Sequence, residues 1–152
     1  MKESKNKEKS VFIHSSISPQ FVGESIAKHQ TKTSIGAHEI FLGQVRSDII
    51  ENKAVMAIEF SAYEEMANEK AAEIREEAFE KFNITCMHVY HSLGRIEIGE
   101  ICFFVFASSA HRADARHAVA WLVDKIKSEL PIFGKEILED NTEIWKTNKP
   151  LK

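Results

Sequence analysis

Two cationic side chains stand at the start of a predicted helix, in the segment SSAHRADA at residues 108–115. The segment follows an apolar run, so His111 and Arg112 fall at the helix N-terminus. The helix dipole favours anions at that end and disfavours cations. Ser108 or Ser109 can cap the helix and leave backbone N–H groups beside the guanidinium. Unless the pair is simply solvated, this arrangement predicts a site for a phosphate or carboxylate.

Three further cations lie where the chain leaves a predicted element. Arg46 follows the strand-like run FLGQV, and Lys127 falls in the last turn of the final long helix. Lys135 follows the helix break at Pro131 and Gly134. Each of these alone is compatible with a solvated surface charge, and Lys127 also suits the negative end of its helix. Only the three cations together, and not any one of them, indicate a functional site.

Composition restricts the classes of function. The chain has 152 residues, a formal net charge of -3, 43% hydrophobic and 28% charged residues. These values are typical of one soluble domain and argue against a general binder of nucleic acid or anionic membranes. We expect residues 1–10 to be a disordered charged tail and residues 11–152 to be a single domain. The charged N-terminus has no apolar core behind it, so we expect a cytoplasmic protein.

The cysteines and histidines do not form a metal-binding pattern. Cys86 and Cys102 fall inside apolar runs without a paired-cysteine motif. This pattern favours buried free thiols over a disulfide or a metal site. His88 and His91 are expected on opposite faces of one strand, where His91 bonds locally. The sequence contains no P-loop, GxGxxG, GxSxG or HExxH motif. We therefore expect neither a metal nor a bound cofactor.

The hydrophobic pattern predicts an α+β fold. Apolar alternation and helical periodicity give the order βα-ββα-ββα-β, with about three helices and a mixed or antiparallel sheet. The predicted strands cover about residues 10–16, 35–45, 55–62, 84–94 and 100–109, with a last short segment within 135–148. The predicted helices begin at Ser18 and cover residues 63–82 and 110–129. Residues 47–54 are expected to be a loop, and residues 95–99 a hairpin connection.

Local signals refine these elements. Ser18 and Pro19 predict an N-cap and a first helical position. Ser61 and Glu64 have the spacing of a capping box. The second helix is expected to bury one face, and Gly36 and Gly43 mark a bulge or a close approach. That predicted face consists of Met66, Ile74, Ala78 and Phe82.

Several segments together resemble the catalytic (large) subunit of molybdopterin synthase. The resemblance covers about residues 36–145. Its pieces are FLGQVRSD, IEFSAYEEMANEKAAEI, VYHSLGRIEIGE, VFASSAHRADA and LPIFGKE. It implies a homodimer with an α/β hammerhead-type fold. It also implies a heterotetramer with a small ubiquitin-like sulfur carrier that ends in a Gly-Gly thiocarboxylate. The implied enzyme is a sulfurtransferase that transfers two sulfurs to cyclic pyranopterin monophosphate and forms molybdopterin, in molybdenum cofactor biosynthesis.

The resemblance also implies roles for individual residues. Lys127 matches an essential catalytic lysine, and Lys135 a second pocket lysine that assists it. The implied substrate-binding residues are Gln44, Val45, Arg46, His111, Arg112, Lys127, Lys135, Glu136 and Ile137. Two features depart from the family pattern. Gln44 stands where a lysine is common. Lys127 and Lys135 are eight residues apart, whereas the two lysines of the family pattern are seven apart. The family pattern has a tryptophan directly before the second lysine, and this chain has Gly134 there. These differences leave open whether Lys135 reaches the pocket.

Helix geometry separates the predicted site residues. Arg112 and Lys127 are fifteen residues apart on one helix, which corresponds to roughly 22 Å at 1.5 Å per residue. One small molecule cannot contact both within a chain. We therefore expect a pocket across the two-fold axis, with Lys127 and Arg46 from one protomer and His111 and Arg112 from its mate. The alternatives are a non-catalytic dimeric module that binds an acidic tail or a phosphorylated metabolite, and a domain whose charges are merely solvated.

Overall fold

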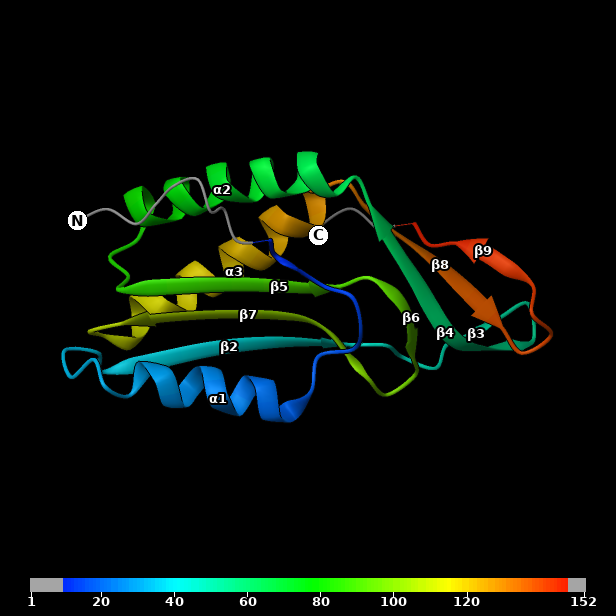
Figure 1. Ribbon diagram of the computed structural model, residues 1–152, viewed down its shortest axis with the longest axis horizontal. Helices are drawn as coiled ribbons and strands as arrows, with labels where there is room; N and C mark the ends of the chain where they lie inside the picture. The colour runs from blue at the N-terminus through cyan, green and yellow to red at the C-terminus, as the bar shows by residue number, and fades with distance from the viewer. Residues whose placement is uncertain (1–9, 148–152) are drawn as a thin grey trace.

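The computed structural model describes residues 10–147, which form an α+β fold with two sheets (Figure 1). The expected α+β class and the helix number are confirmed. The predicted tail lies almost entirely outside the described residues. The helices are α1 (Pro19–His29), α2 (Glu64–Lys81) and α3 (Arg112–Glu129). The strands are β1 (Phe12–Ile13), β2 (Ala37–Gln44), β3 (Ile49–Ile50), β4 (Lys53–Ala62), β5 (Cys86–Ser92), β6 (Gly94–Glu97), β7 (Ile101–Ser109), β8 (Ile132–Leu138) and β9 (Glu143–Trp145).

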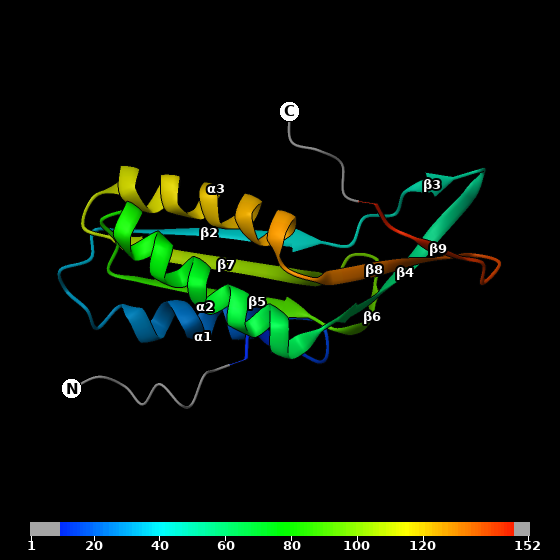
Figure 2. The same cartoon turned by 90° about the horizontal axis from the view of Figure 1, so that it is seen from above.

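The larger layer is a sheet of order β1-β5-β7-β2, covered by helices on both faces (Figures 1 and 2). Helix α1 lies on one face, and α2 and α3 lie on the other. Alternation along β7 divides its side chains between the two layers. Phe104 and Phe106 pack toward α1, whereas Phe103 and Val105 join the main core under α2 and α3. The sheet is antiparallel except for the β1–β5 pair.

The second sheet extends beyond the end of the first (Figure 2). Its order is β3-β4-β8-β9, with β6 also paired to β4. Strand β8 begins immediately after α3, because the helix ends at its C-cap Leu130 and Pro131 cannot continue it. The C-terminal end of α3 therefore lies at the junction of the two sheets. No helix within residues 10–147 is long and apolar enough to cross a membrane.

Several local predictions are confirmed. Ser18 caps α1 through its Oγ, which accepts a hydrogen bond from the Phe21 N–H at 3.0 Å, and Pro19 opens the helix. A Cβ on Gly36 would collide with the backbone oxygen of Ala110, and the β2–β7 register shifts between Gly43 and Gln44. These glycines therefore mark the predicted close approach and bulge.

Two predicted connections are wrong because they contain strands. The expected loop at 47–54 is a β3–β4 hairpin, in which Glu51 and Asn52 both adopt positive φ as a tight turn requires. The expected hairpin connection at 95–99 contributes β6, which pairs with β4 of the second sheet. Both errors have the same cause, since short strands carry too few residues for a clear alternation.

Predictions at the helix starts also need correction. Ser61 belongs to β4, and α2 has Tyr63 as its N-cap without a side-chain hydrogen bond, so no capping box forms. Met66 is exposed, whereas the buried face of α2 consists of Ala67, Ala71, Ile74 and Ala78. At α3 the N-cap is His111, because Ser108 and Ser109 are still part of β7.

Candidate active site

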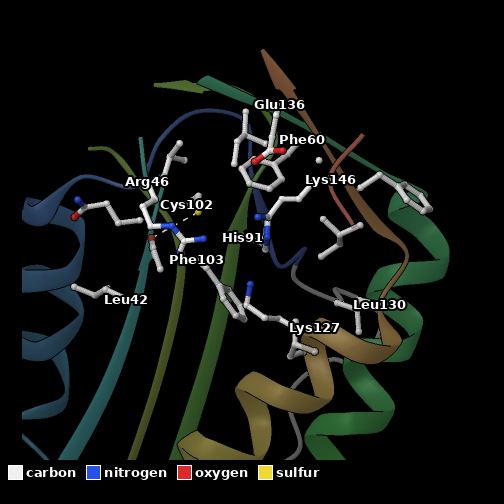
Figure 3. A pocket seen from close by; sticks show the side chains of 18 of the residues that line it. Leu42, Arg46, Phe60, His91, Cys102, Phe103, Lys127, Leu130, Glu136 and Lys146 are labelled. Atoms are coloured by element: carbon white, nitrogen blue, oxygen red, sulfur yellow. Dashed lines mark hydrogen bonds between the residues drawn. The ribbon is translucent and has the colours of Figure 1, made fainter. Parts of the chain in front are cut away.

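A cavity of about 730 Å³ lies at the junction of the two sheets, beside the C-terminal end of α3 (Figure 3). Both sheets, the loop after β2 and the last turn of α3 contribute to its walls. Five of the predicted site residues line it: Gln44, Val45, Arg46, Lys127 and Glu136. Helix α3 and strands β2 and β8 thus bring together residues that are far apart in the sequence.

Lys127 points into this cavity from the last turn of α3 (Figure 3). Its Nζ lies 5.4 Å from the centroid of the Phe103 ring, within the range of a cation–π contact. Solvent reaches the side chain through the open cavity, but the surrounding protein removes enough water from the amine to lower the pKa of Lys127. The charge of Lys146 lowers it further, whereas Cys102 opposes the shift. A lowered pKa makes it easier for the amine to release a proton and thus to act as an acid or a base.

His91 and Cys102 form the wall beside Lys127 (Figure 3). The His91 ring is buried, and burial, together with the charge of Lys127, lowers its pKa to about 4 although the Ser92 carbonyl opposes the shift. Burial likewise raises the pKa of the Cys102 thiol. The predicted opposite orientation of His88 and His91 is confirmed, because His88 contacts His29 of α1 instead. Both cysteines are buried and free, as expected.

The opposite rim of the cavity carries Arg46, which is held by Asp48. Its Nε donates to Oδ1 of Asp48 at 2.7 Å and its Nη2 donates to Oδ2 at 3.2 Å. This two-pronged pair raises the pKa of Arg46 and fixes the plane of the guanidinium. The Arg46 side chain is 76% exposed, so an anion from solvent can reach it. Arg46 is therefore oriented but remains available to a ligand.

Strand β8 contributes Ile132, Phe133, Gly134 and Glu136 to the lining of the cavity. Gly134 and Glu136 line it, whereas Lys135 between them is not among the lining residues. Lys135 Nζ donates to Oε1 of Glu143 at 3.1 Å and lies 5.1 Å from the Trp145 ring centroid. A shift of one residue moves a strand side chain to the opposite face. Lys135 therefore lies on the face of β8 opposite to Gly134 and Glu136, away from the cavity.

Three other predicted residues also lie away from the cavity of the same chain. Ile137 is buried in the core between strands. His111 and Arg112 are exposed at the far end of α3, and neither side chain has a hydrogen bond or ion pair within residues 10–147. Two basic side chains without internal partners are consistent with an external anion.

The structure adds lining residues that sequence reasoning missed. His91, Cys102 and Lys146 all line the cavity. His91 could have been placed there, because it shares a strand face with Val89, which belongs to the main core. Lys146 carried no comparable signal, since it follows the three-residue strand β9. Within the described residues no group of three or more His, Cys, Asp or Glu side chains could hold a metal ion.

Comparisons with known proteins agree with this geometry. The family model described as "MoaE protein" matches residues 15–129. A molybdopterin synthase catalytic subunit of Pyrococcus abyssi is 36% identical over 115 residues, which is 76% of this chain and 76% of that protein. The human molybdopterin synthase catalytic subunit is 35% identical over 114 residues, or 75% of this chain. The chain thereby spans only 60% of the human relative's length.

Solved structures show the same arrangement of elements. Molybdopterin synthase from Staphylococcus aureus superposes with a TM-score of 0.78 at 30% identity, covering 91% of this chain and 97% of that chain. A complex of subunits 1 and 2 of the molybdopterin-converting factor from Helicobacter pylori gives a TM-score of 0.77 at 19% identity, covering 91% of this chain and 90% of that chain, which supports the fold alone.

The fold is the α+β arrangement of the solved molybdopterin synthase from Staphylococcus aureus. The chain belongs to the MoaE family. Its curated relatives in that family are molybdopterin synthase catalytic subunits.

Proposed function

We propose that the chain is the catalytic subunit of molybdopterin synthase, a sulfurtransferase of molybdenum cofactor biosynthesis. It transfers two sulfurs from a small thiocarboxylated carrier to cyclic pyranopterin monophosphate and produces the dithiolene of molybdopterin. The observation that carries this proposal is the cavity of about 730 Å³ in which Lys127 and Arg46 face one space in a chain of this family. The free, buried cysteines are consistent with the expected cytoplasmic location.

The residue types fit a reaction whose nucleophile comes from the partner. The carrier thiocarboxylate supplies the sulfur, so the catalytic subunit needs no activated cysteine. The buried Cys102, whose pKa is raised, agrees with this assignment. Lys127 is the acid–base residue, and Arg46 binds negative charge on the substrate or the carrier tail. Lys146 adds a second cation to the cavity.

The partner is a small ubiquitin-like carrier with a C-terminal Gly-Gly thiocarboxylate. The Helicobacter pylori structure is described as a complex of two subunits. We infer that this chain likewise forms a complex with its carrier. The open cavity with several cations suits an acidic chain terminus. The assembly is a heterotetramer built on a homodimer of catalytic subunits.

The pocket is shared between protomers of that homodimer. His111 and Arg112 lie at the end of α3 opposite Lys127, roughly 22 Å away. A two-fold axis can bring this end of one helix to the cavity of the other protomer. We assign the substrate phosphate to His111 and Arg112 of the mate. Lys135 and Ile137 remain predicted site residues, although the geometry of one chain does not bring them to the cavity.

The direct test is to incubate the purified protein with a thiocarboxylated carrier and cyclic pyranopterin monophosphate. We expect the dithiolene product, and none with a carrier that ends in an ordinary carboxylate. A non-catalytic binding module would bind the carrier tail and release no product. Tight binding of the thiocarboxylated carrier without any sulfur transfer would therefore contradict the proposal.

A further inference from the structure

Lys146 reaches the cavity because of its register with β8. Strand β9 pairs with β8 so that Trp145 lies opposite Lys135. The N–H of Lys146 donates to the carbonyl oxygen of Gly134 at 2.7 Å, which continues this pairing by one residue. Residues opposite one another on antiparallel strands share a face. Lys146 therefore shares the face of Gly134 and lines the cavity with it, whereas Lys135 and Trp145 contact each other outside the cavity (Figure 3).

Gly134 leaves the space beside Lys146 without a side chain. A Cβ at this position would lie 3.1 Å from Cγ2 of Ile58 and 3.3 Å from Cε1 of Phe60, so a larger residue would force these neighbours to move. The cross-strand neighbour of Lys146 thus has no side chain that could cover its ammonium group. Within residues 10–147 the Lys146 side chain forms no ion pair or hydrogen bond, in contrast to Lys135, whose amine donates to a carboxylate.

The charged groups of the cavity wall leave an excess of positive charge. Three cations, Arg46, Lys127 and Lys146, stand against two carboxylates, Asp48 and Glu136. Both carboxylates act on Arg46, since Asp48 accepts its hydrogen bonds and the charge of Glu136 also raises its pKa. The ammonium groups of Lys127 and Lys146 repel each other, which lowers the pKa of Lys127. An anion in the cavity would relieve this repulsion.

We propose that Lys146 is a binding residue for the anionic end of the carrier tail, which it holds beside Lys127. This proposal rests on the proposed function, in which the substrate phosphate is assigned to His111 and Arg112 of the mate. The tail ends in a thiocarboxylate before sulfur transfer and in a carboxylate afterwards. A compact ammonium group on a flexible stem suits both ends, because it does not require two oxygens in a fixed plane.

Binding of two forms of the carrier tests this role without turnover. One form ends in the ordinary Gly-Gly carboxylate, and the other ends in a C-terminal amide of similar shape without the charge. Calorimetric titration at low salt is expected to show that the wild type prefers the carboxylate form. Lys146→Gln is expected to weaken binding of the carboxylate form about three- to tenfold and to leave the amide form within about twofold. Lys146→Arg, which keeps the charge, is expected to restore binding to within about threefold of wild type.

Lys53→Gln is the matched control, because Lys53 lies in the same sheet, pairs with Asp140 at 2.7 Å and does not line the cavity. The proposal is wrong if the wild type binds both carrier forms equally, or if Lys146→Gln weakens the carboxylate form no more than Lys53→Gln does. It is also wrong if Lys135→Gln, and not Lys146→Gln, removes the preference for the carboxylate. A wild type that binds neither form would instead contradict the proposed function, and this proposal with it.

A second readout needs no carrier. The pH dependence of Lys127 acetylation, followed by mass spectrometry, reports the pKa of its amine. Removal of a neighbouring positive charge favours the ammonium form, so we expect the pKa of Lys127 to rise in Lys146→Gln and to stay unchanged in Lys146→Arg and Lys53→Gln. The other titratable groups beside Lys127, namely His91 and Cys102, are the same in all of these variants. An unchanged Lys127 titration in Lys146→Gln would show that the two amines do not share one space, and would contradict the proposal.

Discussion

Lys127 and Arg112 lie at opposite ends of the same helix, and only Lys127 reaches the cavity. Helix α3 runs without a kink in Figures 1 and 2. Fifteen residues at a rise of 1.5 Å per residue therefore separate Lys127 and Arg112 by roughly 22 Å. If Lys127 and Arg112 act on the same substrate molecule, they must therefore come from two different protomers. The roles of the individual cations follow from this separation.

Lys127→Ala is expected to lower sulfur transfer by at least a hundredfold while leaving the fold and carrier binding intact. The side chain opens into the cavity, so its removal deletes the acid–base group without opening the core. Single-turnover product formation and a carrier titration measure the two effects. Lys125→Ala is the matched control, because Lys125 lies on the same helix and pairs with Glu129. Near-normal turnover in the Lys127 variant would remove Lys127 from the mechanism.

Asp48→Asn is expected to tighten substrate binding at low salt. Asp48 competes with any anion for the guanidinium of Arg46, and the amide keeps the shape of the side chain without its charge. The pair is largely exposed, so the effect is modest, about a two- to fivefold lower KM with little change in kcat. Steady-state kinetics at two salt concentrations test this, since the difference fades as salt rises. A higher KM in the variant would mean that Asp48 supports Arg46 more than it competes with it.

Cys102→Ala is expected to retain sulfur transfer within about threefold of the wild-type rate. Cys102 lines the cavity beside Lys127, but burial raises its pKa and disfavours the nucleophilic thiolate. The carrier supplies the sulfur, so no protein persulfide is required. A loss above a hundredfold in a variant with an unchanged unfolding transition would identify Cys102 as a nucleophile.

His91 makes the stability of the protein depend on pH. Its pKa is about 4 when folded and 6.5 when unfolded, so the unfolded state binds more protons between these values. Stability is therefore fully present above pH 6.5 and is lost as the pH falls toward 4. A shift of this size corresponds to about 3 kcal/mol. Urea unfolding of wild type and His91→Phe at pH 7 and pH 4 isolates this contribution, because other titrating groups cancel in the difference. An equal acid destabilisation of both proteins would contradict it.

The long elements could be predicted from the sequence because their patterns are strong. Strand β7 and helix α3 carry continuous apolar runs or a clear helical period, and their bounds agree with the prediction to within two residues. The two-residue strand β3 and the four-residue strand β6 could not be recognised, because these segments become strands only by pairing with β4. Their local sequence is compatible with a loop.

The candidate site was predictable where residues follow long elements. Arg46 and Lys127 each end a strongly patterned segment, and both reach the cavity. The position of Lys135 depends on the register of β8, because a shift of one residue moves a strand side chain to the opposite face. His91 and Lys146 depend on which strands become neighbours, which no local pattern reports. Tertiary pairing therefore determines the part of the site that sequence reasoning missed.

The most direct test of the shared pocket mixes the Lys127→Ala and Arg112→Ala variants after subunit exchange. Each variant alone lacks one essential group in both pockets of its homodimer. The heterodimer regains one pocket with an intact Lys127 from one protomer and an intact Arg112 from the other.

With random pairing, we predict recovery to about a quarter of the wild-type sulfur-transfer activity, since half of the dimers are mixed and half of their pockets are intact. Unfolding curves verify that Arg112→Ala is folded, as expected for an exposed residue. No recovery after confirmed exchange would contradict a pocket that combines α3 ends from two protomers.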